Sequence, residues 1–368
     1  MTRDLIGSRI KALRQAKGLS QDGLAQLLGF KDRQTVSTIE TGARRVTAQE
    51  LLLAAEKLGA PIDYFTDPFR LDGEARFSWR QCGVPPKRLS EYESCASRWI
   101  GAYRTLLPQV GGKMRLMRPS LGLTKQSRYE DAIEAGERFA AEFKLGEIPA
   151  KRLVEVMENE LGILVLMVDA EEGISGAACR LPDMDAVLIA RREIAGRRYF
   201  DLAHELFHIL TWEAMPPKHV EEAVESGGDR IEQLANNFAA SVLMPSAEVM
   251  RSGPWEKFDA DSLVARLNSL ASTLEVTSSA LRWRLVALGE LPAASAREIP
   301  QASLRNNGRI EAKLPPPPLF SKPFAEVLGT ALQQGCVSVR RAAALVDASV
   351  DDLPEMLAAH GVEHEVEL

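Results

Sequence analysis

The stretch that decides the fold is YFDLAHELFHIL, residues 199–210, in which His204 and His208 are four residues apart and Glu205 directly follows the first. Residues four apart lie one above the other on one face of an α-helix, so both imidazoles can reach a single metal ion at about 2 Å. Glu205 lies about 100° further round the helix, where it can contact a metal-bound water. The pattern predicts a metal site with a general base, as in metal-dependent hydrolases.

A simpler interpretation is a buried amphipathic helix with two hydrogen-bonded core histidines. A third ligand would favour the metal site, because zinc sites with two histidines usually add a carboxylate or another histidine. Glu232 is the candidate, on a second predicted helix, IEQLANNFAASVLM, whose small alanines allow close approach and whose Asn236 could hydrogen-bond to a ligand. Taken alone, Glu232 could equally be a solvated charge at a helix N-terminus. The rival ligands are Glu213, Glu221, Glu222, Glu225 and His219.

Composition narrows the class of protein. The chain has 368 residues, 45% of them apolar, which is enough for two or three domains. Its net charge of −6 requires any nucleic-acid contact to come from a local basic face. Four scattered cysteines without a C-x-x-C pair favour a reducing cytoplasm over a disulfide framework or a thiolate zinc site. The longest apolar run, residues 161–168, is too short to span a bilayer, and the charged N-terminus is no signal peptide, so no membrane partner is expected.

Glycine and proline divide the chain into four predicted segments. Residues 1–68 form five short helices, with Ser20 and Thr47 as N-caps. Residues 69–125 are expected to be a linker with one helix of its own. Residues 126–290 contain helices around three strand-like runs, GILVLMV, ISGAACRL and AVLIAR. Residues 291–368 form a C-terminal helical region, interrupted by the stiff sequence PPPP.

The N-terminal segment contains the pattern GLSQDGLAQLLGFKDRQTVSTIETG, which predicts a helix-turn-helix. Small Ala25 lies where the two helices would cross, and Gly29 makes the turn. The segment closely resembles the Xre/Cro-type repressor domain across residues 5–65. The resemblance implies that the second helix enters the major groove of double-stranded DNA, and that two copies bind a palindrome as a homodimer.

Side chains that could contact DNA lie on that second helix and beside it. Contacts to base edges are expected from Arg33, Gln34, Thr35 and Thr38. Contacts to the phosphate backbone are expected from Gln21, Arg44 and Arg45. The turn FKDRQT is one residue longer than the commonest form, so the register of base contacts stays open by one position. Residues 1–68 hold ten Lys/Arg against eight Asp/Glu, so a domain that packs on the rest of the chain without binding DNA is the alternative.

The second half carries the motifs SGAACRL, AVLIA, RRYFDLAHELFH, EQLANNFAASVLMP and ALRWRLVALG. Together they resemble the ImmA/IrrE family of metallopeptidases over residues 130–290 or so. The resemblance implies a helix-and-small-sheet fold and a zinc site in which the glutamate of E-x-x-A-N-x-F-A is the third ligand. On this chain the ligands become His204, His208 and Glu232, with Glu205 as general base. Phe207 stands where the family often has glycine, which implies a different neighbour beneath the site.

The expected fold class is mainly α: a five-helix DNA-binding domain, an α+β zincin-like metallopeptidase domain with a small sheet, and a C-terminal helical region. The resemblances imply a cytoplasmic transcription or stress-response regulator fused to a zinc-dependent endopeptidase that cleaves a repressor-like partner protein. Mn²⁺ or Fe²⁺ could use the same ligands. The alternative is a transcription factor, or a toxin–antitoxin or phage-defence regulator, whose metal site is sensory or structural without turnover. The C-terminal helices could form a dimerisation element, a sensor or a lid.

Overall fold

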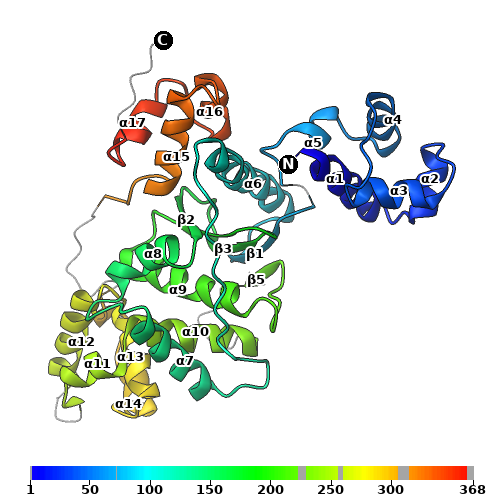
Figure 1. Ribbon diagram of the computed structural model, residues 1–368. Helices are drawn as coiled ribbons and strands as arrows, with labels where there is room; N and C mark the ends of the chain where they lie inside the picture. The colour runs from blue at the N-terminus through cyan, green and yellow to red at the C-terminus, as the bar shows by residue number, and fades with distance from the viewer. Residues whose placement is uncertain (1, 72, 223–228, 256–259, 306–314, 363–368) are drawn as a thin grey trace.

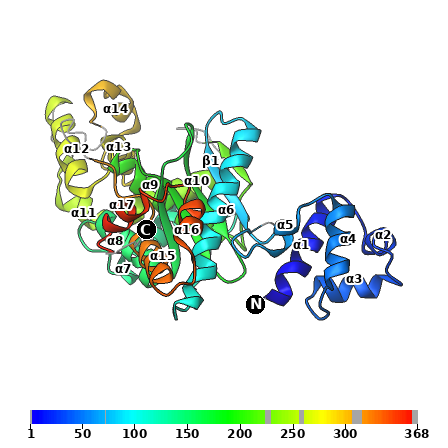
Figure 2. The same cartoon turned by 90° about the horizontal axis from the view of Figure 1, so that it is seen from above.

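The computed structural model describes residues 2–71, 73–222, 229–255, 260–305 and 315–362. Helices α1 to α5 form a unit at one side of the molecule, and the remaining elements surround a small sheet (Figures 1 and 2). The observed fold is mainly α with a small sheet, as expected. In the part of the chain that is described, no helix is both long and apolar enough to cross a membrane.

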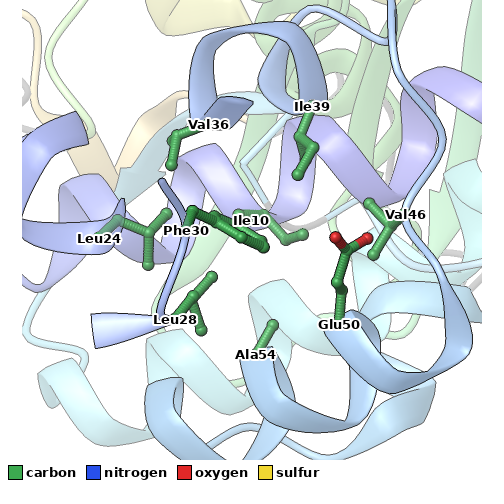
Figure 3. Close-up of a pocket in the computed structure, with 9 residues that line it drawn as sticks. All are labelled: Ile10, Leu24, Leu28, Phe30, Val36, Ile39, Val46, Glu50 and Ala54. Carbon is green, nitrogen blue, oxygen red and sulfur yellow. The ribbon is translucent and has the colours of Figure 1, made fainter. Parts of the chain in front are cut away.

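The N-terminal unit has the five predicted helices: α1 (Thr2–Ala16), α2 (Gln21–Leu27), α3 (Arg33–Glu40), α4 (Ala48–Leu58) and α5 (Ile62–Thr66). The predicted caps are confirmed, because the Ser20 and Thr47 side chains accept backbone N–H groups at the starts of α2 and α4. Asp32 caps α3 in the same way. Apolar side chains from α1 to α4 converge on one core, which Figure 3 shows from within.

A five-stranded sheet forms the centre of the larger part of the chain. The strands are ordered β2 (Ile163–Val168), β4 (Asp185–Ala190), β3 (Ile174–Arg180), β1 (Arg76–Gln81) and β5 (Val220–Glu222). β2 and β5 run parallel to their neighbours β4 and β1, whereas β3 pairs antiparallel with both β4 and β1. The predicted strand-like runs correspond to β2, β3 and β4. Strand β1 was not predicted, since its residues fall in the segment expected to be a linker.

The two faces of the sheet belong to two different cores, because successive side chains of a strand point to opposite faces. One face, which includes Phe77 and Trp79 of β1, packs against α6 and the C-terminal helices. These are α6 (Pro86–Gln109), α15 (Lys322–Gln333), α16 (Val339–Leu345) and α17 (Leu353–Ala358). The other face, which includes Val165 and Val187, packs against the helices of the middle of the chain. The C-terminal helices therefore do not cover the face that carries the histidine helix.

The helices on that second face follow in chain order. They are α7 (Tyr129–Glu142), α8 (Ala150–Asn159), α9 (Ala195–Thr211), α10 (Arg230–Leu243), α11 (Ser246–Arg251), α12 (Ala260–Leu274), α13 (Ser278–Ala287) and α14 (Ala293–Glu298). Helix α9 lies on β3 and β4, and α10 packs between α9 and α7. The α7–α10 crossing is tight: a Cβ on Gly136 would lie 2.1 Å from the Ser241 hydroxyl oxygen. Helix α10, which carries Glu232, is thereby held closely against α7.

The four-segment division of the chain stays a prediction, but packing crosses its boundaries. The expected linker provides β1, paired with β3 over its whole length, and the long helix α6. Phe320 pairs with Met167 at the outer edge of β2, next to α15. The segments before residue 126 and after residue 290 thus share the core of the sheet with residues 126–290.

Candidate metal centre

His204, His208 and Glu232 converge between α9 and α10. The Nε2 atoms of the two histidines are 3.1 Å apart. Glu232 places one carboxylate oxygen 3.2 Å from Nε2 of His204 and the other 3.2 Å from Nε2 of His208. Two ligands at about 2.05 Å from a tetrahedral ion are about 3.3 Å apart, so the three side chains have the spacing of a shared coordination sphere. Among the described residues, they are the group that could hold a metal ion.

A hydrogen bond to α10 gives His204 the orientation expected of a metal ligand. Nδ1 of His204 lies 2.9 Å from Oδ1 of Asn236, one turn after Glu232 on α10. Because Nε2 faces the ligand group, Nδ1 carries the proton and donates it to the Asn236 oxygen, an arrangement typical of metal-binding histidine. Burial, with the nearby positive charge of Arg80, lowers the pKa of His204 to about 3, so the imidazole is neutral and offers a lone pair.

Glu232 on α10 and Glu205 on α9 are two buried carboxyl groups of the centre whose pKa values shift in opposite directions. Burial alone would raise the pKa of Glu232, but its contacts with His204 and His208 outweigh burial and lower that pKa. Glu205 is buried against β3, where its carboxylate accepts a hydrogen bond from the Ala178 amide. Burial raises the pKa of Glu205 well above its ordinary value, and the charge of Glu232 adds to this effect. A raised pKa makes a carboxylate a stronger base, which suits a group that takes up a proton from water.

Two charged residues that sequence analysis missed complete the centre. Arg80 reaches in from β1, with Nη1 3.0 Å from Nε2 of His204 and 3.4 Å from Oε2 of Glu232. Its Nε lies 3.2 Å from Oδ1 of Asp201, on the first turns of α9. Burial raises the pKa of Asp201 to about 6, although Arg80 opposes the shift. Asp201 precedes His204 by one helical turn in an otherwise apolar stretch, which could have singled it out; Arg80 gave no comparable signal.

The rival ligands lie apart from this group where the structure describes them. The side chain of Glu213 is 81% exposed and pairs with Arg180 at 2.9 Å. Nε2 of His219 lies 2.6 Å from a carboxylate oxygen of Glu93. Outside the described parts of the chain are residue Glu225 and the side chains of Glu221 and Glu222.

The residues predicted to contact DNA fall into two groups. Arg33 and Gln34 are exposed at the start of α3, and Arg45 is exposed after it, whereas Thr35 and Thr38 are half-buried. Two predicted phosphate contacts are engaged within the domain. The amide of Gln21 donates to Glu40 at 2.9 Å, and Arg44 pairs with Glu50 at 2.6 Å. Arg33, Gln34 and Arg45 are therefore the side chains of this set best placed for a new partner.

Comparison with known protein families gives a match for each of two regions of the chain. Residues 10–65 match the family described as Helix-turn-helix. Residues 158–285 match the peptidase family described as IrrE N-terminal-like domain. The chain joins a helix-turn-helix domain to an IrrE-like peptidase-family domain. No curated protein and no solved structure matches it.

Both resemblances drawn from the sequence are thus confirmed. The helix-turn-helix domain supports DNA binding, and the IrrE-like domain indicates a metallopeptidase that uses a divalent metal. The matched range of the IrrE-like domain includes α9 and α10 with all three candidate ligands, whereas Arg80 lies outside it. Phe207, the departure from the family pattern, is fully buried and packs on Phe238 of α10, with 5.7 Å between ring centroids. Its neighbour beneath the site is therefore α10, the helix that carries Glu232.

Proposed function

We propose that this protein is a DNA-binding regulator whose IrrE-like domain is a zinc-dependent endopeptidase acting on a repressor-like protein. His204, His208 and Glu232 are the ligands, and Glu205 is the general base. The observation that supports this most is the convergence of three ligand side chains, with contacts of 3.1 to 3.2 Å, beside a buried carboxylate of raised pKa. Mn²⁺ or Fe²⁺ would fit the same donor set.

The chain's own residues define the chemistry. A bound divalent ion would supply Lewis acidity and a water of lowered pKa. His204 is neutral and held by Asn236, so it binds without adding positive charge. Glu205 takes the proton of the attacking water and returns it to the leaving amine. The Ala178 amide and the packing of Glu205 on β3 fix the direction from which the base acts.

On the DNA side, we propose that Arg33, Gln34, Thr35 and Thr38 face base edges. Arg45, with Gln21 and Arg44, would contact phosphates. Arg33 and Gln34 support this proposal, because both are exposed at the start of α3. Two such domains on a palindrome require a homodimer. DNA binding would place the endopeptidase at the operators where a repressor substrate is concentrated.

One observation, the nearly complete burial of the two histidine side chains, favours a second function. The side chains of His204 and His208 are only 1% and 2% exposed. A centre that a substrate carbonyl does not reach would act as a structural or sensory metal site of a transcription factor, or of a toxin–antitoxin or phage-defence regulator. Cleavage of a protein substrate distinguishes the endopeptidase from the structural or sensory metal site.

The test compares three full-length proteins loaded with Zn²⁺: wild type, Glu205→Gln, and the control Glu213→Gln, which removes an exposed charge just after the same helix. Each is incubated with the cytosolic proteins of the producing cell, and new protein N-termini are identified by amine labelling and mass spectrometry. Wild type and Glu213→Gln should generate the same new N-termini, and Glu205→Gln should generate none while it binds equal zinc. Identical N-termini from all three would contradict the endopeptidase, and zinc retention would then support the sensory or structural site.

A further inference from the structure

The Arg80 guanidinium lies within the ligand group rather than beside it. Its Nη1 contacts Nε2 of His204 and Oε2 of Glu232 at 3.0 and 3.4 Å. These separations match the spacing of about 3.3 Å between two ligands of one tetrahedral ion. Arg80 thus lies against the ligand atoms at the distances of a fourth ligand, but an arginine that keeps its proton has no lone pair to offer a metal.

Two features hold Arg80 in this position. Its Nε pairs with Asp201, whose side chain is 4% exposed, so the guanidinium is bound at both ends by buried groups of α9 and α10. Residues 77 and 79 of β1 face the opposite core, so residue 80 must point toward α9. The Arg80 side chain is 13% exposed, against 1% and 2% for the two histidines, so it is the part of the centre nearest solvent.

The positive charge of Arg80 would repel a divalent ion bound at this centre. Asp201, Glu205 and Glu232 are three buried carboxyl groups, and Arg80 is the cation whose positive charge acts on all three. A divalent ion bound by His204 and Glu232 would supply the same compensation with twice the charge. Two cations within a few ångströms in a buried site repel strongly, because little water screens them. The ion and the guanidinium would therefore compete for the same ligand atoms.

We propose that Arg80 is an internal cation that competes with the metal for His204 and Glu232, so that loading requires Nη1 to leave the ligand group. This inference rests on the proposed metal site and adds its regulation. Asp201 keeps its contact with Nε during the exchange, so Arg80 moves about a fixed point. Because Arg80 is the most exposed member of the group, the same movement opens the centre toward solvent. Metal loading and access to the ligands are thus one event.

The test measures Zn²⁺ affinity in metal-free protein by competition with a chromophoric chelator. Arg80→Met removes the charge and keeps much of the side-chain volume. Arg76→Met is the control, since Arg76 lies on the same strand but is exposed and stacks over Trp212 at 5.7 Å. Arg80→Met should bind Zn²⁺ at least tenfold more tightly than wild type, and Arg76→Met should match wild type within about twofold.

If wild type binds zinc and Arg80→Met binds it no more tightly, the proposed role of Arg80 is refuted, whereas the proposed metal site is not. Zinc binding by neither protein would overturn both. The rise of Tm on adding saturating zinc gives a second measurement, with Arg80→Ala examined in parallel. This rise of Tm should be larger in Arg80→Met and Arg80→Ala than in wild type, because binding stabilises the folded state in proportion to the logarithm of affinity. A residue that only packs would lower Tm with and without zinc by the same amount, which would also refute competition.

Discussion

Glu158 provides a prediction about stability that is independent of the metal centre. It lies half-buried on α8, near Val165 of β2 and Ser321 at the start of α15. Burial raises its pKa from 4.5 to about 7, although the Ser321 hydroxyl and the Val165 amide favour the charged form. Glu326 is the other charged group that acts on it, and it raises the pKa slightly further. The folded protein therefore holds a proton on Glu158 that the unfolded chain releases above pH 4.5.

The sign and size of the effect follow from the difference in pKa. Between pH 4.5 and 7 the folded state binds one proton more than the unfolded state, so stability falls as pH rises through this window. A difference of about 2.5 pKa units at 1.36 kcal/mol each amounts to about 3 kcal/mol, fully expressed above pH 7. Glu158→Gln is uncharged at every pH and lacks this loss. It should match wild type near pH 4 and exceed its unfolding free energy by about 3 kcal/mol at pH 8.

Urea denaturation of wild type and Glu158→Gln from pH 4 to 8.5, followed by circular dichroism, measures this difference directly. Glu155→Gln is the matched control, because Glu155 lies on the same helix with its side chain 61% exposed. Its unfolding free energy should track wild type within about 0.5 kcal/mol at all pH values. A Glu158→Gln protein that is no more stable than wild type at pH 8 would refute the account, as would a difference that does not grow between pH 4.5 and 7.

Two other groups of residues give further predictions. Asn236→Leu should weaken zinc affinity by about 10- to 100-fold because His204 loses its hydrogen-bond acceptor; isothermal titration measures this, and unchanged affinity would exclude the role of Asn236. Arg33→Ala should cost about 1–3 kcal/mol of binding to a selected operator at fixed salt and relax base preference at one position, whereas an unchanged sequence preference would remove Arg33 from the base-contacting set. Arg45→Ala should lower the affinity for all DNA sequences more than Arg44→Ala does, because Arg44 already pairs with Glu50. Fluorescence anisotropy measures both affinities, and a larger loss in Arg44→Ala would contradict this prediction.

Local sequence patterns were sufficient to predict the two helices that carry the candidate ligands. The i, i+4 spacing of His204 and His208 and the alanine-lined face around Glu232 are properties of single helices, and both helices form as expected. The approach of Glu232 to the histidines needed more than spacing, because it depends on how α10 packs against α9 and α7. The family resemblance supplied that information, and the three candidate ligands lie close together in the structure.

Arg80 could not be predicted, because it reaches the centre through a long-range pairing. RFSWRQ is six residues long, its apolar positions alternate only twice, and it pairs with a strand about a hundred residues later. Gln21 and Arg44 illustrate the same limit on the DNA-binding side. Each looked available in the sequence, but a glutamate brought near by folding already binds it. Charged side chains are the hardest to assign from sequence, since their partners depend on tertiary contacts.

The ligation of one divalent ion by His204, His208 and Glu232 is tested most directly by zinc K-edge X-ray absorption combined with elemental analysis. Wild type and Glu232→Ala are compared at equal protein concentration. We predict one zinc per chain in wild type, with two imidazole nitrogens and a carboxylate oxygen at about 2.0–2.2 Å, and loss of that zinc in Glu232→Ala. Zinc that remains bound with unchanged ligation in Glu232→Ala, or a wild-type site without imidazole ligands, would contradict the central claim.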